Sequence, residues 1–151
     1  MYVKDNETIS INEINPNNKR HLIVVDVCRN LVKIQKNDET RVAMNAIMES
    51  ASLSINYRKI FDDAVMNNPE GRIIAYSCDI NQSAGDDGNG GVFTQELLDS
   101  PNYFSANNRY GIVKINQAFE QAQKKTYEKN APQKPVFNAG RRMDFYPFAI
   151  I

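Results

Sequence analysis

The sequence predicts an α/β domain in which a mostly parallel sheet is flanked by helices. Two continuously apolar segments, His21–Val27 and Arg72–Cys78, predict this class, because unbroken apolar runs are typical of strands buried on both faces of a parallel sheet. The second observation is that apolar residues recur at helical spacing between and after these two segments, which predicts helices there. Strands that alternate with helices form parallel crossovers. A chain of 151 residues suffices for one domain, 1–151.

The elements before the second strand begin with a short helix over Ser10–Ile14, with Ser10 as the expected N-cap. The strand His21–Val27 comes next. The following Asn30–Ser54 segment is ambiguous, since part of it fits either a helix or a strand. A helix is predicted for Ile55–Met66, which ends at an Asn-Asn-Pro-Glu-Gly stop and carries apolar residues at helical spacing: Tyr57, Ile60, Phe61, Ala64 and Val65.

The elements after the second strand begin with a glycine- and acid-rich loop, QSAGDDGNGG. One helix is predicted to begin over Val92–Leu98. A second, Asn116–Lys129, is amphipathic, with Ala118, Phe119, Ala122 and Tyr127 facing inward. The tail Arg142–Ile150 alternates well enough for a last strand, in which Pro147 indicates an edge or a bulge.

Composition excludes several classes of protein. Eighteen basic residues balance eighteen acidic ones, so neither a nucleic-acid nor a membrane partner is expected. No apolar run approaches the roughly 18 residues of a membrane span, and the polar N-terminus lacks the core of a secretion signal. Two cysteines fit reduced thiols in the cytoplasm. With a single histidine, they cannot supply the four Cys and His ligands of a structural zinc site.

Chemically useful residues stand at the carboxyl ends of both predicted strands, where sites gather in open α/β sheets. Asp26 and Cys28 end the first strand, and Ser77, Cys78 and Asp79 end the second. If the strands are neighbours, these residues face one cleft. A thiolate there is a strong nucleophile once a nearby cation or base lowers its pKa. The alternative is that each cysteine is simply a small buried apolar residue.

Three segments resemble caspase-like cysteine peptidases, especially metacaspases and their bacterial relatives. DVCRN is similar to the D-x-C-R/H signature around the nucleophile. YSCDINQSAGDDGNGGVFTQELL is similar to the stretch that joins a strand end, a specificity loop and a G-x-F-T-x-x-L helix start. APQKPVFNAGRRMDFYPFAI is similar to the Q-x-P…F-P-F ending of bacterial members. The resemblance spans almost the whole chain and implies a partial caspase-like sandwich and a cysteine endopeptidase acting on proteins or peptides.

The resemblance also implies residue roles. Cys28 would be the attacking thiolate, and its backbone N–H would stabilise the oxyanion. Asp26 would line the S1 pocket and pair with an arginine or lysine immediately before the cleaved bond. Gly85 stands where animal caspases carry the arginine that selects aspartate, so aspartate specificity is not expected. The remaining expected substrate-binding residues are Ser77, Cys78, Asp79 and Asp86.

Alternatives remain open for the acidic residues. Asp26 could instead form a salt bridge with Arg29 or Arg72. Asp86 and Asp87 could help to bind calcium, as carboxylates do in some metacaspases, or could be solvated turn residues. No other metal or cofactor is expected.

The S-G-H-G-type segment that carries the family's catalytic histidine is missing from the sequence. His21 begins the strand that Cys28 ends, so roughly 20 Å separates it from the thiol and it is expected to be a surface residue at the strand edge. Three explanations follow: a fragment of a longer peptidase, a remnant that pairs with a histidine-bearing chain, or a stand-alone pseudo-enzyme whose residues 1–20 rebuild the sheet edge.

Two functions therefore compete. The chain is either a portion of a cysteine endopeptidase that needs a histidine-bearing segment, or an inactive caspase-like module that binds a protein partner or peptide. A flavodoxin-like phosphate binder is disfavoured, because the acid-rich loop QSAGDDGNGG would repel phosphate.

Overall fold

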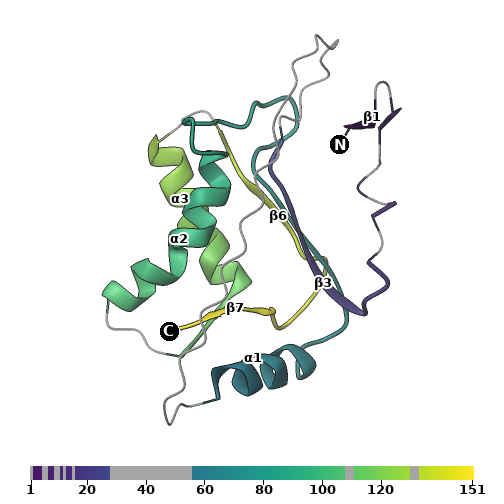
Figure 1. The fold of residues 1–151 in the computed structure, drawn as a ribbon, viewed down its shortest axis with the longest axis vertical. Coiled ribbons are helices and arrows are strands. Elements are labelled where there is room, and N and C mark those ends of the chain that lie inside the picture. The colour runs from purple at the N-terminus through teal and green to yellow at the C-terminus, as the bar shows by residue number, and fades with distance from the viewer. Residues whose placement is uncertain are drawn as a thin grey trace.

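The computed structural model describes residues 2–4, 7–8, 11, 13–14, 16–27, 56–107, 111–129 and 133–151 (Figure 1). Cys28, Arg29 and the ambiguous Asn30–Ser54 segment lie outside the described residues. The predicted α/β class is confirmed, because helices and strands alternate along most of the described chain.

The central described sheet has three strands in the order β3-β4-β6. β3 (Arg20–Val25) runs parallel to β4 (Gly71–Tyr76), in a register that pairs Arg20 with Gly71 and Val25 with Tyr76. β6 (Val136–Asn138) runs antiparallel to β4. The sheet is therefore mixed, and the prediction of a mostly parallel sheet is not confirmed in the described residues. β6 escaped prediction because three residues are too few to show a period.

Two smaller sheets complete the described strands. β1 (Tyr2–Lys4) pairs antiparallel with β2 (Glu7–Thr8). β5 (Ile112–Lys114) pairs antiparallel with β7 (Pro147–Ile150), and the register shifts between Val113 and Lys114. The predicted last strand, Arg142–Ile150, is confirmed over Pro147–Ile150 only, and residues 142–146 are not in a strand. Pro147 is the first residue of β7 and lies opposite the irregularity, as its prediction at an edge or bulge requires.

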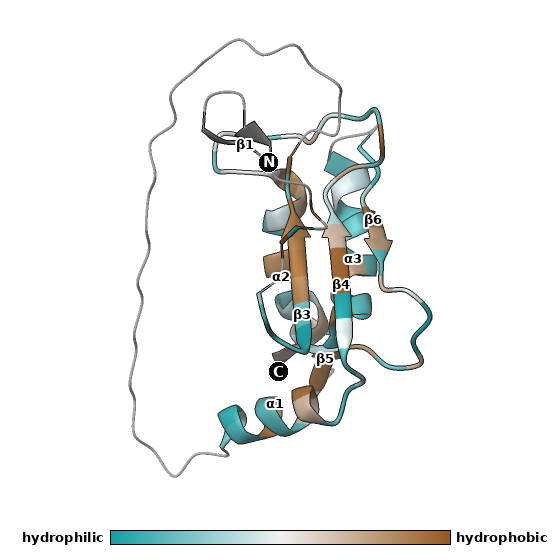
Figure 2. Cartoon of the chain, turned by 90° about the vertical axis from the view of Figure 1, so that its right-hand side faces the viewer, coloured by the Kyte–Doolittle hydropathy of each residue, from teal (hydrophilic) through white to brown (hydrophobic). Residues whose placement is uncertain are grey.

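Helices α2 (Val92–Ala106) and α3 (Ile115–Lys129) pack against each other on one side of the sheet (Figure 1). Their aromatic rings make the centre of the core. The ring centroids of Phe93 and Phe119 lie 5.5 Å apart edge to face, and those of Phe119 and Phe137 lie 4.8 Å apart. Apolar residues of the strands turn toward these helices, and Figure 2 shows the apolar stretches along β3 and β4.

The inward face of α3 differs from the prediction at one position. Ala118, Phe119 and Ala122 are buried as expected, but Tyr127 is 62% exposed. Thr126 takes the inward position instead and is completely buried. The reason is helical geometry: the residue four positions after Ala122 continues its stripe, whereas the fifth turns away.

Helix α1 (Tyr57–Met66) confirms the predicted helix but not its buried face. The side chain of Asn56 caps it by accepting from the Lys59 amide at 2.9 Å. None of its residues is buried, and Tyr57 is 54% exposed. The helix lies beyond the starts of the strands beside β7, rather than over a face of the sheet, so its apolar side has little to cover (Figure 1).

Strand β3 lies at the edge of the described sheet, so the prediction of a central strand buried on both faces is wrong for the described residues. Its residues are partly buried, and Val24 is 40% exposed.

In the predicted helix over Ser10–Ile14, the described residues Ile11 and Glu13 lie in turns. Arg72 holds this segment, since its Nη2 donates to the Ile14 carbonyl at 3.0 Å. Ile11 and Ile14 also line one groove together with residues of β3.

His21 lies on β3 at the edge of the described sheet, as expected, and its partly exposed ring makes contacts through both nitrogens. Arg72 Nε donates to His21 Nε2 at 3.0 Å, and His21 Nδ1 lies 3.1 Å from the carbonyl oxygen of Asn18. Both ring nitrogens are engaged, which assigns the proton to Nδ1. The imidazole is part of the connection between the N-terminal segment and the sheet.

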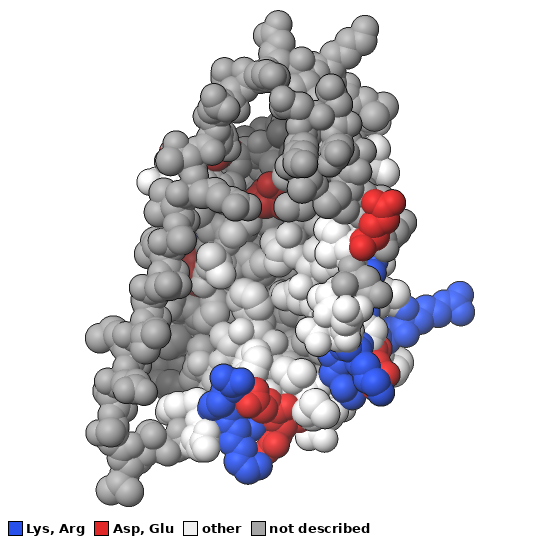
Figure 3. All heavy atoms as spheres, turned by 45° about the vertical axis from the view of Figure 1, so that its right-hand side comes forward, with Lys and Arg blue, Asp and Glu red and all other residues white. Residues whose placement is uncertain are grey.

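Charged side chains are mixed in sign on the face drawn in Figure 3, where lysine and arginine lie beside aspartate and glutamate. In the part of the chain that the structure describes, no helix has both the length and the apolar character that a membrane crossing requires.

An ion pair fastens β5 to the segment before β7 and makes a prediction about acid stability. Lys114 Nζ lies 2.5 Å from Asp144 Oδ1, which also accepts from the Phe145 amide at 2.8 Å. The Lys114 hydrogen bond, followed by the Phe145 amide, lowers the pKa of Asp144. A depressed carboxyl pKa contributes stability above the unfolded pKa of about 3.9, and that stability is lost as pH falls through the folded value.

Asp144→Asn is therefore expected to be less stable than the parent chain at neutral pH, and this difference should shrink as pH falls below about 3.9 and through the lowered pKa of folded Asp144. Urea denaturation across this range measures it. Asp62→Asn, on the exposed surface of α1, is the control. A difference that stays constant down to acid pH would contradict the role of the Asp144 charge.

Candidate functional site

The ends of β3 and β4 lie side by side. The Ser77 amide donates to the Val25 carbonyl at 2.9 Å, and the Cys78 sulfur lies 3.5 Å from the carbonyl oxygen of Val27. This confirms the prediction that the two strand ends share one edge of the sheet. Cys28 follows Val27 directly in the chain but lies outside the described residues, so its role as nucleophile stays a prediction.

Asp26 makes a contact that none of the sequence alternatives included. Its Oδ2 accepts hydrogen bonds from Thr94 Oγ1 at 2.5 Å and from the Thr94 amide at 3.3 Å. Thr94 lies in the first turn of α2, so a carboxylate from β3 caps this helix in place of a side chain at the N-cap, Gly91. A negative charge at a helix N-terminus is stabilising.

The salt-bridge alternative for Asp26 is wrong for Arg72 and untested for Arg29. The Arg72 guanidinium is occupied by His21 and by the carbonyls of residues 11 and 14. Arg29 is outside the described residues. Asp26 Oδ1 is buried and has no hydrogen-bond partner among the described residues. One oxygen of Asp26 thus holds the helix, and the other has no partner in the part of the chain that the structure describes.

Gly91 makes this contact possible through its size rather than its backbone conformation. Its φ of −61° and ψ of 126° are allowed for any residue. A Cβ atom at this position would lie 1.9 Å from Asp26 Oδ2 and 2.4 Å from its Cγ. The strand end and the helix start therefore approach so closely that only glycine fits.

Ser77 and Cys78 are completely buried, which does not support a side-chain contact with substrate in this conformation. The Cys78 thiol also lies 3.3 Å from the carbonyl oxygen of Gln82. Ser77 Oγ is buried without a hydrogen-bond partner in the described residues. The environment of Cys78 agrees with the alternative of a small buried residue.

The two predicted loop acids are held by backbone amides of their own loop. Asp79 is partly buried, and its Oδ1 accepts from the Ile80 amide at 2.7 Å. Asp86 is exposed, and its Oδ1 accepts from the Gly88 amide at 2.7 Å. Such contacts are typical of turns. Both acids remain near the strand ends, since the loop that carries them runs from β4 to α2.

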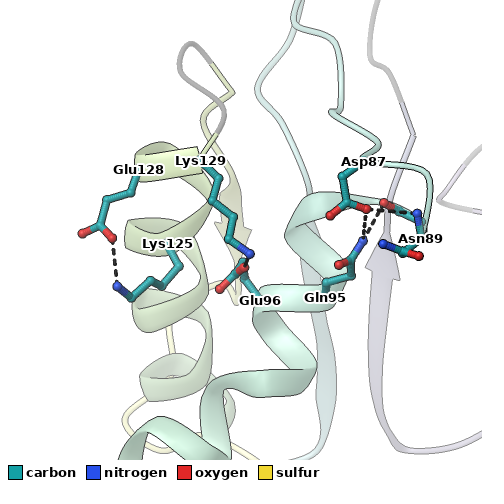
Figure 4. A network of polar contacts seen from close by, with 8 residues as sticks. Asp87, Asn89, Gln95, Glu96, Lys125, Glu128 and Lys129 are labelled. Atoms are coloured by element: carbon teal, nitrogen blue, oxygen red, sulfur yellow. Dashed lines mark hydrogen bonds and ion pairs between the residues drawn. The ribbon is translucent and has the colours of Figure 1, made fainter.

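Asp87 is likewise engaged locally. Its Oδ1 accepts from Gln95 Nε2 at 2.7 Å and from the Asn89 amide at 3.0 Å (Figure 4). The Gln95 hydrogen bond is the main reason that the pKa of Asp87 is lowered. In the described ranges, no three His, Cys, Asp or Glu side chains are placed to hold a metal ion. This geometry favours turn residues over a calcium site.

A groove of about 290 Å³ lies between the N-terminal segment and β3. Among the described residues that line it, Asp26 alone is charged. The others are apolar and come from both sides of the groove: Ile11, Ile14, Ile23, Val24, Val25 and Val27. A groove of this composition suits an aliphatic stem with a positively charged end.

The family model that describes the caspase domain, peptidase family C14, matches residues 2–146. The chain belongs to the caspase domain family. No curated protein and no solved structure matches it. Membership implies a cysteine peptidase-like function with protein substrates, and it confirms the resemblance seen in the three sequence segments.

Three residues of this caspase domain organise the site although the sequence did not predict their roles. Thr94 binds Asp26, Gln82 binds the segment that precedes β6, and Gln133 binds both the end of β4 and the loop. All three lie within the motifs that carry the resemblance. A signal was therefore present, but a motif position alone does not reveal a partner distant in sequence.

Proposed function

We propose that this caspase domain is the nucleophile-bearing portion of a cysteine endopeptidase that cleaves after arginine or lysine. It would act together with a histidine-bearing segment, in the cytoplasm, where Cys28 and Cys78 stay reduced. The observation that carries the proposal is the meeting of the β3 and β4 ends beside the acidic loop, in a chain that belongs to the caspase family.

The histidine must come from elsewhere because the chain contains one histidine and that residue is engaged. His21 Nε2 accepts from Arg72, and Nδ1 is bonded to the Asn18 carbonyl. A general base needs a lone pair within hydrogen-bond reach of the proton it removes. His21 has neither an available lone pair nor a position near the end of β3.

The chemistry follows the general scheme of thiol peptidases. The external histidine takes the Cys28 proton, and the sulfur attacks the carbonyl carbon. The charge that develops on the carbonyl oxygen is stabilised by the Cys28 amide. Collapse breaks the C–N bond, and the leaving amine takes the proton from the histidine. Water then hydrolyses the thioester, with the same histidine accepting and returning the proton.

Asp26 supports the preference for a basic residue. Its Oδ1 has no hydrogen-bond partner among the described residues, and Asp26 is the only charged residue among the described ones that line the apolar groove beside the strand end. A guanidinium or ammonium group would supply the missing hydrogen-bond donors, while its aliphatic stem covers the apolar walls. Asp79 and Asp86 add negative potential from the loop.

The complementary experiment mixes the purified chain with the upstream, histidine-bearing half of a related caspase-family peptidase. Cleavage of fluorogenic peptides that end in arginine or lysine is expected from the mixture and not from either part. Cys28→Ala should abolish it, because no other exposed thiol is predicted at this edge. Cys78→Ala is the matched control and should retain cleavage. Undiminished activity of the Cys28→Ala mixture would refute the proposal.

The second candidate is a non-catalytic module that binds a peptide or protein through the same edge, and the engaged state of His21 favours it. Thiol alkylation separates the two. A Cys28 that reacts no faster than an ordinary thiol, with a pKa of about 8.5, when the histidine-bearing half is present would favour the inactive module.

A further inference from the structure

We propose that Gln133 is the positioning residue for Asp26, acting through Gly85 and the first turn of α2. The inference rests on the proposed function, because it names what places the specificity carboxylate. Gln133 lies about 48 residues beyond the loop and 107 residues beyond Asp26 in the chain, by difference of their numbers. Its side chain is 1% exposed.

Both ends of the Gln133 carboxamide are used. Its Nε2 donates to the Ser77 carbonyl at 2.8 Å, and its Oε1 accepts from the Gly85 amide at 2.8 Å. Ser77 directly follows β4, and Gly85 lies in the loop just before Asp86. A single buried side chain therefore joins the end of the strand to the middle of the loop.

Gln82 makes the reciprocal connection. Its Oε1 accepts from the Lys134 amide at 3.0 Å and from the Asp79 amide at 3.3 Å. Gln82 of the loop thus bonds to the segment before β6, and Gln133 of that segment bonds to the loop. The base of the loop is closed from both sides.

The loop is connected to Asp26 through the first turn of α2. The Gly85 carbonyl accepts from the Val92 amide at 2.9 Å, at the first residue of α2. Two residues further, in the same first turn, Thr94 donates twice to Asp26 Oδ2. Gly85 is therefore held by Gln133 through its N–H and holds the helix start through its C=O. Movement of Gly85 would move the turn that orients the Asp26 carboxylate.

A neutral amide is the side chain that this place requires. Ser77 presents an acceptor and Gly85 a donor, so the buried group between them must donate at one end and accept at the other. A leucine leaves both backbone groups unpaired, which is costly in a buried site. An ionised glutamate accepts only, and its charge would face the Ser77 carbonyl. A protonated glutamate has both functions again.

Amide hydrogen exchange on the purified chain tests the connection without requiring activity. In Gln133→Leu, the Gly85 and Thr94 amides are expected to exchange at least 10-fold faster, while the amides within β4 change little. Gln133→Glu should regain protection of Gly85 as pH falls and the carboxyl group takes up a proton, after correction for intrinsic exchange. Gln123→Leu is the matched control, since its Nε2 donates to the Pro135 carbonyl rather than to a backbone group of the loop.

The reconstituted peptidase supplies the functional arm. Gln133→Glu at neutral pH is expected to raise KM for arginine-ending peptides about 10-fold, with kcat changed less than about 3-fold, because orientation of Asp26 affects binding of the basic residue. Thr94→Val, which breaks the last link, should raise KM similarly yet leave Gly85 protected.

The outcomes are distinguishable. The positioning role is overturned if the Gly85 and Thr94 amides exchange at the parent rate in folded Gln133→Leu, or in Gln133→Glu at neutral pH. It is also overturned if Gln123→Leu speeds their exchange equally. Faster Gly85 and Thr94 exchange with no cleavage by any mixture supports the positioning role and refutes the peptidase. If Gln133→Leu does not fold, the pH-dependent recovery in Gln133→Glu decides, and its absence counts against the inference.

Discussion

Gly91→Ala is expected to destabilise the domain by about 3 kcal/mol, the sum of overpacking and a lost helix cap. The added methyl would overlap the Asp26 carboxylate, whose Oδ2 and Oδ1 lie 1.9 and 2.7 Å from the Cβ position. Asp26 cannot retreat without releasing both hydrogen bonds from Thr94. The end of β3 and the start of α2 would separate. Urea denaturation measures the loss of unfolding free energy.

The control for Gly91 is Gly88→Ala in the same loop. A Cβ at Gly88 meets nothing within 4 Å, but its φ of +90° is unfavourable for alanine. A cost of about 1 kcal/mol is expected from backbone strain alone. Equal effects of the two substitutions would mean that the contact between Gly91 and Asp26 contributes nothing beyond an ordinary glycine effect.

Asp26→Asn is expected to reduce kcat/KM for arginine-ending peptides by about 10²-fold in the reconstituted peptidase. Removing the charge forfeits the ionic hydrogen bonds to a guanidinium, which are worth a few kcal/mol when partly desolvated. Stability should fall by less than about 1 kcal/mol, because the asparagine oxygen still accepts from Thr94 and only the charge at the helix N-terminus is lost. The same assay with a neutral residue before the cleaved bond should show little change.

Two further variants serve as comparisons for Asp26→Asn. Asp26→Ala removes the cap together with the charge and should lose both stability and cleavage. Asp99→Asn, exposed on the same helix, should change neither. If Asp26→Asn lowers cleavage of basic and neutral peptides equally, Asp26 acts through the position of α2 and not as the partner of a basic side chain.

These expectations share one structural basis. In this caspase domain the strand that leads to Cys28 is joined to α2 by Asp26, and α2 is joined to the loop by Gly85. The loop is joined to the segment before β6 by Gln82 and Gln133. The contacts of Asp26, Gln82 and Gln133 are hydrogen bonds between elements distant in sequence, whereas the Gly85 contact is local. The proposed substrate cleft is therefore held by polar contacts around an aromatic core.

Local patterns predicted most helices and the two long strands. The runs of β3 and β4 are apolar enough to be recognised alone, and α1, α2 and α3 begin within two residues of the predicted starts. The predictions failed where the packing of an element against its neighbours decides its burial, its place in the sheet or its direction. The inward side of α1, the edge position of β3 and the antiparallel direction of β6 depend on what packs beside each element, which a period in the sequence does not contain.

The sequence by itself determined the α/β class, the membership suggested by three ordered motifs, and the placement of Asp26 beside the expected nucleophile. Only the tertiary structure decided what Asp26 does with its oxygens, why residue 91 is glycine, and why Gln133 is buried. The physical reason is distance along the chain: the partners of Asp26 and Gln133 lie 68, 48 and 56 residues away. Short-range periodicity reports burial and secondary structure, whereas such pairings exist only once the strands and helices have packed.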